Sequence, residues 1–411
     1  MNYNEALDFV HSIPKFVRPL GNIKLSGLLE LMDNPQNKLK FVHIAGTNGK
    51  GSVCSMTAEI LRRAGYKTGL FTSPFIEVFN ERIQINGGMI DDSQLAEYIT
   101  NTSKLMEENA LQVSEFAFIT AVALQYFADN GCDIVVLETG MGGRFDATNI
   151  IPSPLCCAFT SISLDHTQYL GNTIEEIALE KCGIIKSGTT VISAPNDKAE
   201  NIIKAEAEKN NVKLVICEKA DKTKKGFVYK NREYSLGLSG EYQAENGAVA
   251  LEIINVLRNK GFNIGDIHIN DGLANAKWRA RYEFFTPDIV IDGGHNIDGI
   301  RVLKKSLVNE NRPITIVIAM MQDKDYADCI DSITEIAVNV IATELNMPRS
   351  LKACEIQRVC NDSEKKCIAI PNVKSAISKA VEVSCGGLVC ICGSLYLAGE
   401  AIKILKEELY L

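Results

Sequence analysis

A glycine-rich loop between an apolar segment and a helical pattern is the first feature of this sequence that could do chemistry. The strand-like segment Phe41–Ala45 runs into Gly46-Thr47-Asn48-Gly49-Lys50-Gly51-Ser52. Glycines let consecutive backbone N–H groups turn toward a phosphate, and the start of the next helix adds positive dipole. Lys50 could reach the β- and γ-phosphates, and the Ser52 hydroxyl could hold Mg²⁺. The pattern predicts a site for a nucleoside triphosphate.

The spacing of this loop differs from the standard P-loop. The standard pattern separates its glycines more widely and places Ser or Thr directly after Lys. Here Gly51 stands between Lys50 and Ser52. A glycine-rich turn that binds no ligand is the alternative interpretation. The strand–loop–helix context favours phosphate binding.

Three residues farther along the chain could assist at such a site. Glu138 follows a buried strand pattern, and α/β proteins place ligand chemistry at the carboxyl ends of strands. Its carboxylate could hold Mg²⁺ or could instead cap the following turn. His166 also follows a strand pattern, but a lone histidine is more often structural than a metal ligand. Lys181 falls in a helical pattern, where a lysine is usually a solvated charge.

The elements that must position these residues alternate between strands and helices, which predicts an α/β fold. Most of the strand patterns are short apolar runs, as expected for buried parallel strands. The expected strands are residues 40–45, 133–137, 155–163, 189–194, 288–292, 313–320, 338–343 and 387–392. The expected helices include residues 52–64, 198–209 and 242–260.

The chain is predicted to form two domains. Residues 1–285 are expected to form a P-loop-containing, parallel-sheet ATPase domain, and residues 286–411 a smaller, Rossmann-like, doubly wound domain. Thr286-Pro287 provides the local punctuation between them. The polar, Lys-rich stretch Ala220–Leu238 is expected to be an antiparallel elaboration at a sheet edge.

Composition limits the classes of function. The chain has 411 residues, a net charge of -8 and no basic tail, so a nucleic-acid partner is not expected. No apolar stretch is long enough to span a bilayer, so no membrane partner is expected. Residues 1–14 carry Asn2, Glu5 and Asp8, unlike a secretory signal. The 13 cysteines are therefore predicted to be free, buried thiols of a cytoplasmic protein.

Several segments together resemble the folylpolyglutamate synthase and dihydrofolate synthase family of the Mur ligase superfamily. The loop carries the strongest likeness, because Mur ligases proper usually lack the glycine that here precedes Ser52. The likeness covers most of the chain. Its other segments are Gly27–Gln36, Thr72–Phe75, Asn80–Gly87, Leu137–Asn149, Ser163–His166, Ile177–Ile184, Gly240–Ala248 and Trp278–Glu283. Phe75 is a departure, because the family commonly has His there.

The resemblance implies roles for the residues of the first domain. Residues 46–52 would bind ATP, and two magnesium ions would be held by Ser52, Ser73, Glu138, His166 and Lys181, with a potassium ion left open as a further cation. Lys50, Glu138, His166 and Lys181 would act in catalysis. The lysine matching Lys181 is carbamylated in Mur-type ligases, and burial could lower its pKa enough for CO₂ to add to the neutral amine.

The resemblance extends to the domain junction and the second domain. Asn246 matches a position that contacts adenine, although it could simply start a helix. Arg281 could clamp the triphosphate or form a plain ion pair. Asp292 and His295, in Asp292-Gly293-Gly294-His295-Asn296, would reach the ribose and phosphates of the nucleotide. Arg349 and Ser394 are weak candidates for binding glutamate.

The activity that the resemblance implies is an ATP-dependent amide ligase. It would add L-glutamate to tetrahydrofolates, to dihydropteroate, or to both, through an acyl phosphate, and would act as a monomer. Residues 15–36 could contribute to a pterin pocket. The alternatives are a Mur-type ligase for another carboxylate and a nucleotide-binding relic without activity. A cell-wall ligase would need a further domain ahead of the loop at Gly46, and a relic would be expected to lose its costly polar groups.

Overall fold

The chain folds into two compact units. A computed structural model describes residues 1–15, 22–362 and 366–409. The first unit comprises Met1–Gly237 and Ala244–Lys277, and the second comprises Leu238–Gln243 and Trp278–Leu411. The chain therefore passes from one unit to the other three times.

A mixed sheet of eight strands forms the centre of the first unit within the described residues, in the order β4-β3-β2-β5-β1-β6-β7-β8. Neighbouring strands pair in parallel along β2-β5-β1-β6-β7-β8. Strands β3 and β4 add an antiparallel edge beside β2. Strands β1 and β5 are buried along their whole length, as the apolar sequence predicted. The strands are β1 (Phe41–Ala45), β2 (Thr68–Phe71), β3 (Ile83–Ile85), β4 (Gly88–Met89), β5 (Ile134–Glu138), β6 (Cys156–Phe159), β7 (Thr190–Ser193) and β8 (Lys213–Ile216).

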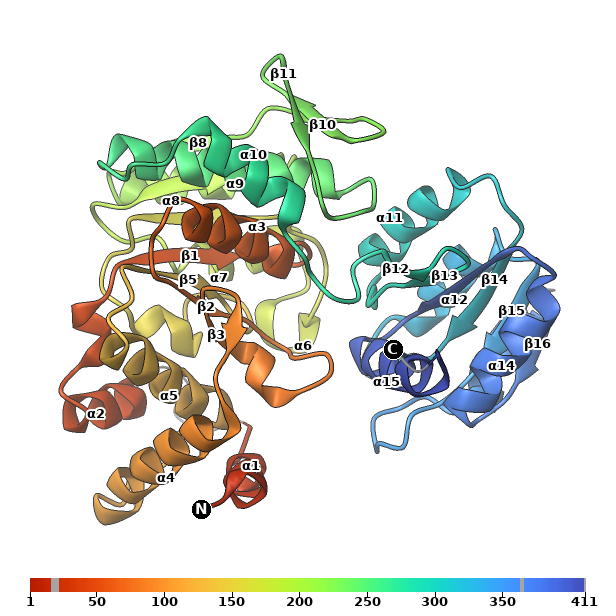
Figure 1. Ribbon diagram of the computed structural model, residues 1–411, viewed down its shortest axis with the longest axis horizontal. Coiled ribbons are helices and arrows are strands. Elements are labelled where there is room, and N and C mark those ends of the chain that lie inside the picture. Colours follow the sequence, from red (N-terminus) through yellow and green to blue (C-terminus); the bar gives the residue numbers. More distant parts are fainter. Residues whose placement is uncertain (16–21, 363–365, 410–411) are drawn as a thin grey trace. The chain divides into compact units, whose positions relative to one another are not determined.

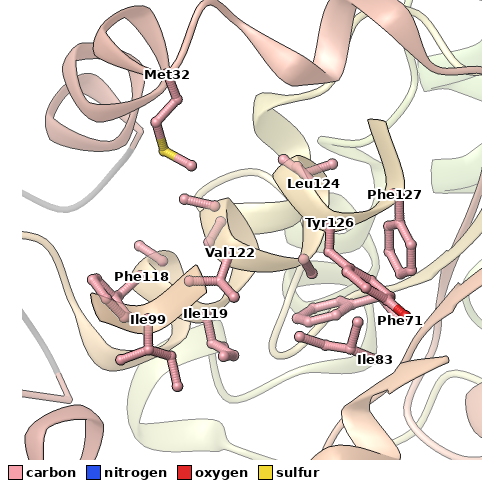
Figure 2. Close-up of a cluster of buried hydrophobic side chains, with 14 of the residues drawn as sticks. Met32, Phe71, Ile83, Ile99, Phe118, Ile119, Val122, Leu124, Tyr126 and Phe127 are labelled. Carbon is pink, nitrogen blue, oxygen red and sulfur yellow. The ribbon is translucent and has the colours of Figure 1, made fainter. Parts of the chain in front are cut away.

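Helices cover both faces of this sheet (Figure 1). One face carries α3, α9 and α10, with α3 packed on β1, β2 and β5. The other carries α4 and α5, whose apolar side chains form a large core (Figure 2) with Phe71 of β2 and Ile83 of β3. The helices are α1 (Tyr3–Ser12), α2 (Ile23–Leu31), η1 (Pro35–Lys38), α3 (Lys50–Arg63), η2 (Phe79–Arg82), α4 (Asp92–Glu108), α5 (Glu115–Asp129), η3 (Ala147–Ile150), α6 (Thr167–Leu170), α7 (Ile174–Cys182), α8 (Glu200–Lys209), α9 (Gln243–Asn259) and α10 (Asp266–Asn275).

The Lys-rich stretch forms its own small sheet. Strands β9 (Asp221–Lys222), β10 (Gly226–Tyr229) and β11 (Arg232–Ser235) pair antiparallel in the order β11-β10-β9. The prediction of antiparallel strands is confirmed, but they do not extend an edge of the main sheet. They lie against α9, where the Phe227 ring packs directly over Gly247 and leaves no room for a side chain there.

The second unit contains a six-stranded sheet in its described residues, in the order β12-β13-β17-β14-β15-β16. Only β12 is antiparallel, and the remaining strands form a parallel, doubly wound arrangement. The strands are β12 (Glu283–Thr286), β13 (Ile289–Ile291), β14 (Ile314–Ile318), β15 (Asn339–Ala342), β16 (Cys367–Ala369) and β17 (Leu388–Cys392). The helices are α11 (Ile297–Val308), α12 (Tyr326–Thr334), α13 (Ala353–Asp362), α14 (Val373–Ser384) and α15 (Leu395–Leu409).

The predicted domain boundary between residues 285 and 286 falls inside the second unit. Thr286-Pro287 connects β12 to β13, and these two strands pair as an antiparallel hairpin. A local turn signal of this kind marks a hairpin as readily as a linker. The second unit begins at Trp278 and also takes in residues 238–243.

The cysteines and the helices agree with most of what composition suggested. All 13 cysteines are free thiols, although Cys354 and Cys385 are exposed, whereas burial was predicted for every one. Within the part of the chain that the structure describes, every helix is too short or too polar to cross a bilayer.

Candidate active site

The phosphate loop has the shape that its sequence predicts. Strand β1 ends at Ala45, and helix α3 begins at Lys50. Gly46 has φ 155° and Gly49 has φ 89°, and only glycine adopts such angles without strain. A Cβ atom on Gly46 would lie 1.8 Å from Thr160 Oγ1. The loop therefore needs its glycines both for backbone conformation and for close approach.

The segment after β6 forms one wall of this loop. Thr47 N donates to the Ser161 carbonyl at 2.7 Å. The Thr47 hydroxyl donates to the Ser163 carbonyl at 3.1 Å and accepts from Ser163 N at 3.0 Å. Thr160 Oγ1 donates to the Asn48 carbonyl at 2.6 Å. These bonds fix the loop to the segment that leads into His166.

The first turn of α9 forms another wall. Asn246 is buried there, and a Cβ atom on Gly49 would lie 2.3 Å from its Oδ1 atom. Two roles were predicted for Asn246, namely contact with adenine or a place at the start of a helix. The structure places it in the first turn of α9 and directly against the phosphate loop. Its contact with adenine stays a prediction.

Two lysines converge on one carbonyl of the loop. Lys50 Nζ donates to the Gly46 carbonyl at 3.1 Å and to the Thr47 carbonyl at 3.2 Å. Lys181 Nζ, from the last turn of α7, donates to the same Gly46 carbonyl at 2.7 Å. Lys181 is only 4% exposed, so it is not the solvated charge that the helical pattern alone would suggest.

Burial sets the protonation of Lys181. Removal from water and, to a smaller extent, the nearby Lys50 ammonium lower the pKa of its amine, Asp165 and Asp146 partly oppose the shift, and the net pKa is about 7. A large fraction of this amine is therefore neutral near pH 7. Neutral amines are nucleophiles that add to CO₂, and the environment of Lys181 suits that reaction.

Glu138 ends β5 and lies at the same edge of the sheet. Its buried carboxylate accepts a hydrogen bond from Ser73 N at 3.0 Å, so the end of β5 and the loop after β2 are joined. Burial raises the pKa of the Cys54 thiol in α3, the negative charge of Glu138 raises it further, and Lys50 opposes the shift. Glu138, Ser73 and the start of α3 therefore lie close to one another.

His166 has a structural role as well as a predicted one. It occupies the left-handed region, with φ 52°, and precedes α6. Its backbone N–H donates to Asp165 Oδ1 at 2.8 Å, and its Nε2 atom lies 3.9 Å from the same oxygen. Asp165 was not a predicted site residue. Its negative charge raises the pKa of Lys181 and so opposes the effect of burial. The signal for Asp165 in the sequence is its position directly before His166, in a segment that follows a strand.

A second glycine-rich loop packs against Lys181. A Cβ atom on Gly143 would lie 2.5 Å from the Lys181 carbonyl oxygen, and Arg144 N donates to the Glu180 carbonyl at 2.8 Å. The loop is organised by Asp146, which accepts from Met141 N at 2.8 Å. The sequence singled out this segment by resemblance but gave Asp146 no role.

The predicted site residues of the second unit are arranged differently. Asp292 is buried, and its Oδ2 atom accepts from the Tyr242 hydroxyl at 3.0 Å and from Tyr282 N at 2.8 Å. Its Oδ1 atom accepts from Gly294 N at 2.7 Å. Burial raises the pKa of Asp292, and the nearby Arg281 and these donors oppose the shift. Asp292 therefore ties together three segments of its own unit.

His295 and the candidates for binding glutamate also contact their own unit. His295 Nδ1 lies 2.9 Å from the Gly293 carbonyl oxygen. Arg349 forms an ion pair with Asp323 at 3.6 Å, and the buried Ser394 accepts from Tyr396 N at 3.1 Å in the first turn of α15. Roles in ligand binding remain predictions for all of them. The predicted pterin segment, residues 15–36, lies partly outside the described residues.

A glycine-rich strand–loop–helix turn, a carboxylate at the end of the neighbouring strand β5 and a buried lysine of α7 that donates to the turn are the features expected of a P-loop ATPase. The comparisons with known proteins give the family. Residues 44–254 match the Mur ligase middle domain, and residues 283–404 match the C-terminal domain of dihydrofolate synthetase. The chain belongs to the folylpolyglutamate synthase and dihydrofolate synthase family of Mur ligases.

Individual relatives agree with this assignment. The chain is 33% identical to the dihydrofolate synthase/folylpolyglutamate synthase of Bacillus subtilis over 98% of this chain and 99% of that one. It is 33% identical to the dihydrofolate synthetase of Saccharomyces cerevisiae over 95% and 99%. A structure of E. coli FolC in complex with DHPP and ADP matches with a TM-score of 0.89 at 25% identity, covering 100% and 99%. The predictions of the fold class, of the family and of an ATP-dependent ligase are confirmed.

Proposed function

We propose that this protein joins L-glutamate to the carboxylate of a folate-type substrate, with ATP as the energy source and an acyl phosphate as the intermediate. The observation that carries the proposal is the meeting of Lys50 and Lys181 at the Gly46 carbonyl, because it places two amines on the loop that would hold the triphosphate. The family membership supports the same reaction.

Lys50 would act by moving from the loop to the nucleotide. Its ammonium now donates to two loop carbonyls, so it is already beside the backbone amides that would bind phosphate. Transfer of this charge to the γ-phosphate would stabilise the negative charge that spreads over the phosphoryl oxygens during transfer. Residues 46–52 would hold the β- and γ-phosphates.

Lys181 would carry a carbamate. The neutral amine would add to CO₂, lose one proton and become a carboxylate on a buried helix. Its fully buried position and its pKa of about 7 support this proposal. The product would be an anion beside the phosphate loop, where it could orient a cation or the attacking group.

The donor set near the loop fits magnesium. Glu138 offers a carboxylate, and Ser52 and Ser73 offer hydroxyls, which are the oxygen ligands that Mg²⁺ prefers. Among residues 1–15, 22–362 and 366–409, no three His, Cys, Asp or Glu side chains gather as a ready-made metal cluster. Mg²⁺ commonly takes one or two carboxylates and completes its shell with phosphate and water. We assign Ser52, Ser73, Glu138, His166 and the Lys181 carbamate to two magnesium sites; bound there, magnesium would neutralise phosphate charge.

The chemistry then needs no nucleophilic side chain. The substrate carboxylate attacks the γ-phosphorus, and ADP leaves. The amine of glutamate attacks the acyl carbon, inorganic phosphate leaves, and the nitrogen loses a proton as the amide forms. The protein would contribute orientation, charge stabilisation and exclusion of water.

We assign nucleotide and carboxylate binding to the first unit and glutamate binding to the second. Asn246 would contact adenine in the first unit, and for Arg281, Asp292 and His295 nucleotide binding remains the prediction that the resemblance implies. We propose a cytoplasmic monomer, and the thirteen free thiols support a reducing compartment.

The test is ADP release by the purified protein, with dihydropteroate and tetrahydrofolate supplied separately, each with and without glutamate. We expect glutamate-dependent ADP release with at least one of them, together with a product heavier by one glutamyl residue. Glutamate-dependent release with dihydropteroate but not with tetrahydrofolate would define a dihydrofolate synthase. Glutamate-dependent release with both substrates would define a bifunctional enzyme. No glutamate-dependent release with either substrate would reject the proposal.

A further inference from the structure

Three buried polar side chains form a relay in the first unit that none of the proposed roles uses. His43 lies in β1, Thr148 lies in η3, and Asp146 immediately precedes η3. His43 Nε2 lies 2.8 Å from Thr148 Oγ1, and Thr148 Oγ1 lies 2.5 Å from Asp146 Oδ1. Their exposures are 0%, 0% and 6%, so the relay is closed to solvent.

The chemistry of the groups fixes the direction of the relay. Asp146 receives donors from Thr148 Oγ1 and Thr148 N on Oδ1, from Met141 N on Oδ2, and from the Gly140 backbone. Burial raises the pKa of Asp146, but so many donors favour its ionised form. An ionised carboxylate can only accept, so the Thr148 hydroxyl proton points to Asp146.

The remaining bond must then run from histidine to threonine. Burial lowers the pKa of His43 to about 3, so the ring is neutral and carries a single N–H. Since the Thr148 hydroxyl already spends its proton on Asp146, that N–H must be on Nε2. His43 Nδ1 has no partner among the described residues, which suits a bare lone pair better than a buried N–H group.

The far end of the relay reaches the active-site lysine. Asp146 fixes Met141 and therefore the glycine loop that follows Glu138. Gly143 of that loop packs on the Lys181 carbonyl, and Arg144 N bonds to the carbonyl of the preceding residue. The Asn22 side chain adds a bond of 3.0 Å to the Asp146 carbonyl. A displacement of Asp146 would therefore weaken the contacts that residues 143 and 144 make with the backbone of α7 beside Lys181.

We propose that His43 and Thr148 are positioning residues for the ligase reaction, acting through Asp146 on the 140–143 loop and on Lys181. The inference deepens the proposed function and rests on it for its kinetic part. Its structural part, a neutral His43 with the proton on Nε2, stands without any assumption about the reaction.

The first experiment reads the tautomer directly. The full-length protein is labelled with ¹⁵N-histidine, and the His43 ring is assigned with a His43→Gln variant and examined from about pH 8 down to about pH 5. We expect a protonated Nε2, a bare Nδ1 and no titration across this range. A proton on Nδ1, or titration within this range, would overturn the relay whether or not the protein turns out to be a ligase.

The second experiment separates the hydroxyl from the packing. Thr148→Val keeps the shape but removes the hydroxyl, Thr148→Ser keeps the hydroxyl, and Thr57→Val makes the same change at a buried threonine of α3 outside the relay. We expect kcat to fall about 10- to 100-fold in Thr148→Val with little change in KM for ATP, and to stay near wild type in the other two. Hydrogen exchange should quicken at residues 140–144 in Thr148→Val alone.

The outcomes are distinguishable. Equal loss of kcat in Thr148→Ser and Thr148→Val would show that the hydroxyl is not the relevant group, and unchanged kcat and exchange in Thr148→Val would show that the relay positions nothing. Absence of turnover in the wild-type protein would reject the proposed function, while the exchange and tautomer measurements would still decide the relay. The tautomer is measured on the wild-type protein, so the proposal can be rejected even if a variant folds poorly.

Discussion

The loop after β1 and the loop after β13 occupy equivalent places in their two units, but their polar residues are engaged differently. Each follows a buried parallel strand and leads into a helix. In the first, Lys50 and Lys181 both donate hydrogen bonds to the carbonyl of Gly46 in the loop itself. In the second, Asp292 accepts from three donors of its own unit.

We infer from this difference that Lys50 and Lys181 can turn to a ligand at little cost, whereas Asp292 is held in place by its own unit. A lysine on a loop carbonyl gives up a modest hydrogen bond when it turns to a phosphate. A buried carboxylate with three donors would leave those donors unpaired if it turned away, which costs more. We therefore expect substitutions in the first loop to affect turnover and substitutions at Asp292 to affect stability.

The largest effect is expected for Lys181→Ala. Loss of the amine would remove the carbamate, so kcat should fall by at least about 100-fold, while ADP binding measured by calorimetry changes little. Wild-type turnover in this variant would remove Lys181 from the mechanism. A large loss of ADP affinity would instead assign the lysine to nucleotide binding.

A somewhat smaller effect is expected for Glu138→Gln. The amide oxygen can still accept from Ser73 N, so the loop after β2 should keep its place while the negative charge is lost. We expect kcat to fall about 10- to 100-fold and the magnesium concentration for half-maximal rate to rise. An unchanged magnesium dependence would exclude Glu138 as a metal ligand.

The second loop should respond in the opposite way. Asp292→Asn replaces one acceptor oxygen by an N–H₂ group, which must then face Tyr242 and Tyr282 or Gly294. We expect the free energy of unfolding in urea to fall by about 1–3 kcal/mol, with a smaller change in kcat than in Glu138→Gln. A stable variant with a large rise in KM for ATP would instead support the predicted role of Asp292 in nucleotide binding.

The finest test concerns the pH dependence of stability. The pKa of Lys181 is lowered from 10.5 to about 7, so between these values the unfolded chain binds more protons than the folded one. Stability therefore rises with pH across this window, by at most about 1.4 kcal/mol per pH unit from this group. Urea unfolding of wild type and Lys181→Met in CO₂-free buffer should show a difference that grows with pH. A constant difference would show that the amine is not protonated on unfolding in this range.

Local sequence patterns predicted the parts of the fold and site that depend on local chemistry. The apolar run Phe41–Ala45 and the glycines after it are enough to predict β1 and the phosphate loop. Glu138 could be placed at a strand end for the same reason. Lys181 could be placed on a helix, but its bond to Gly46 joins residues 135 positions apart, and no local pattern reports its burial.

Pairing between distant segments decided what the sequence could not. Thr286-Pro287 indicated a domain boundary because turn residues do not reveal whether the flanking strands pair with each other. The bonds from Tyr242 and Tyr282 to Asp292 could not be predicted because these partners come from separate stretches of the chain. Asp146 was overlooked because its role depends on bonds to Met141 and Thr148 that appear only when the loop closes on itself.

The contact between Gly49 and Asn246 has a consequence for how the protein can vary. A methyl group at position 49 would overlap the Asn246 side chain at 2.3 Å, and the backbone there already demands glycine. Position 49 should therefore stay glycine whatever residue stands at position 246. A shorter residue at position 246 would relieve the collision but not the backbone demand, so Gly49 is constrained twice over and its neighbour only once.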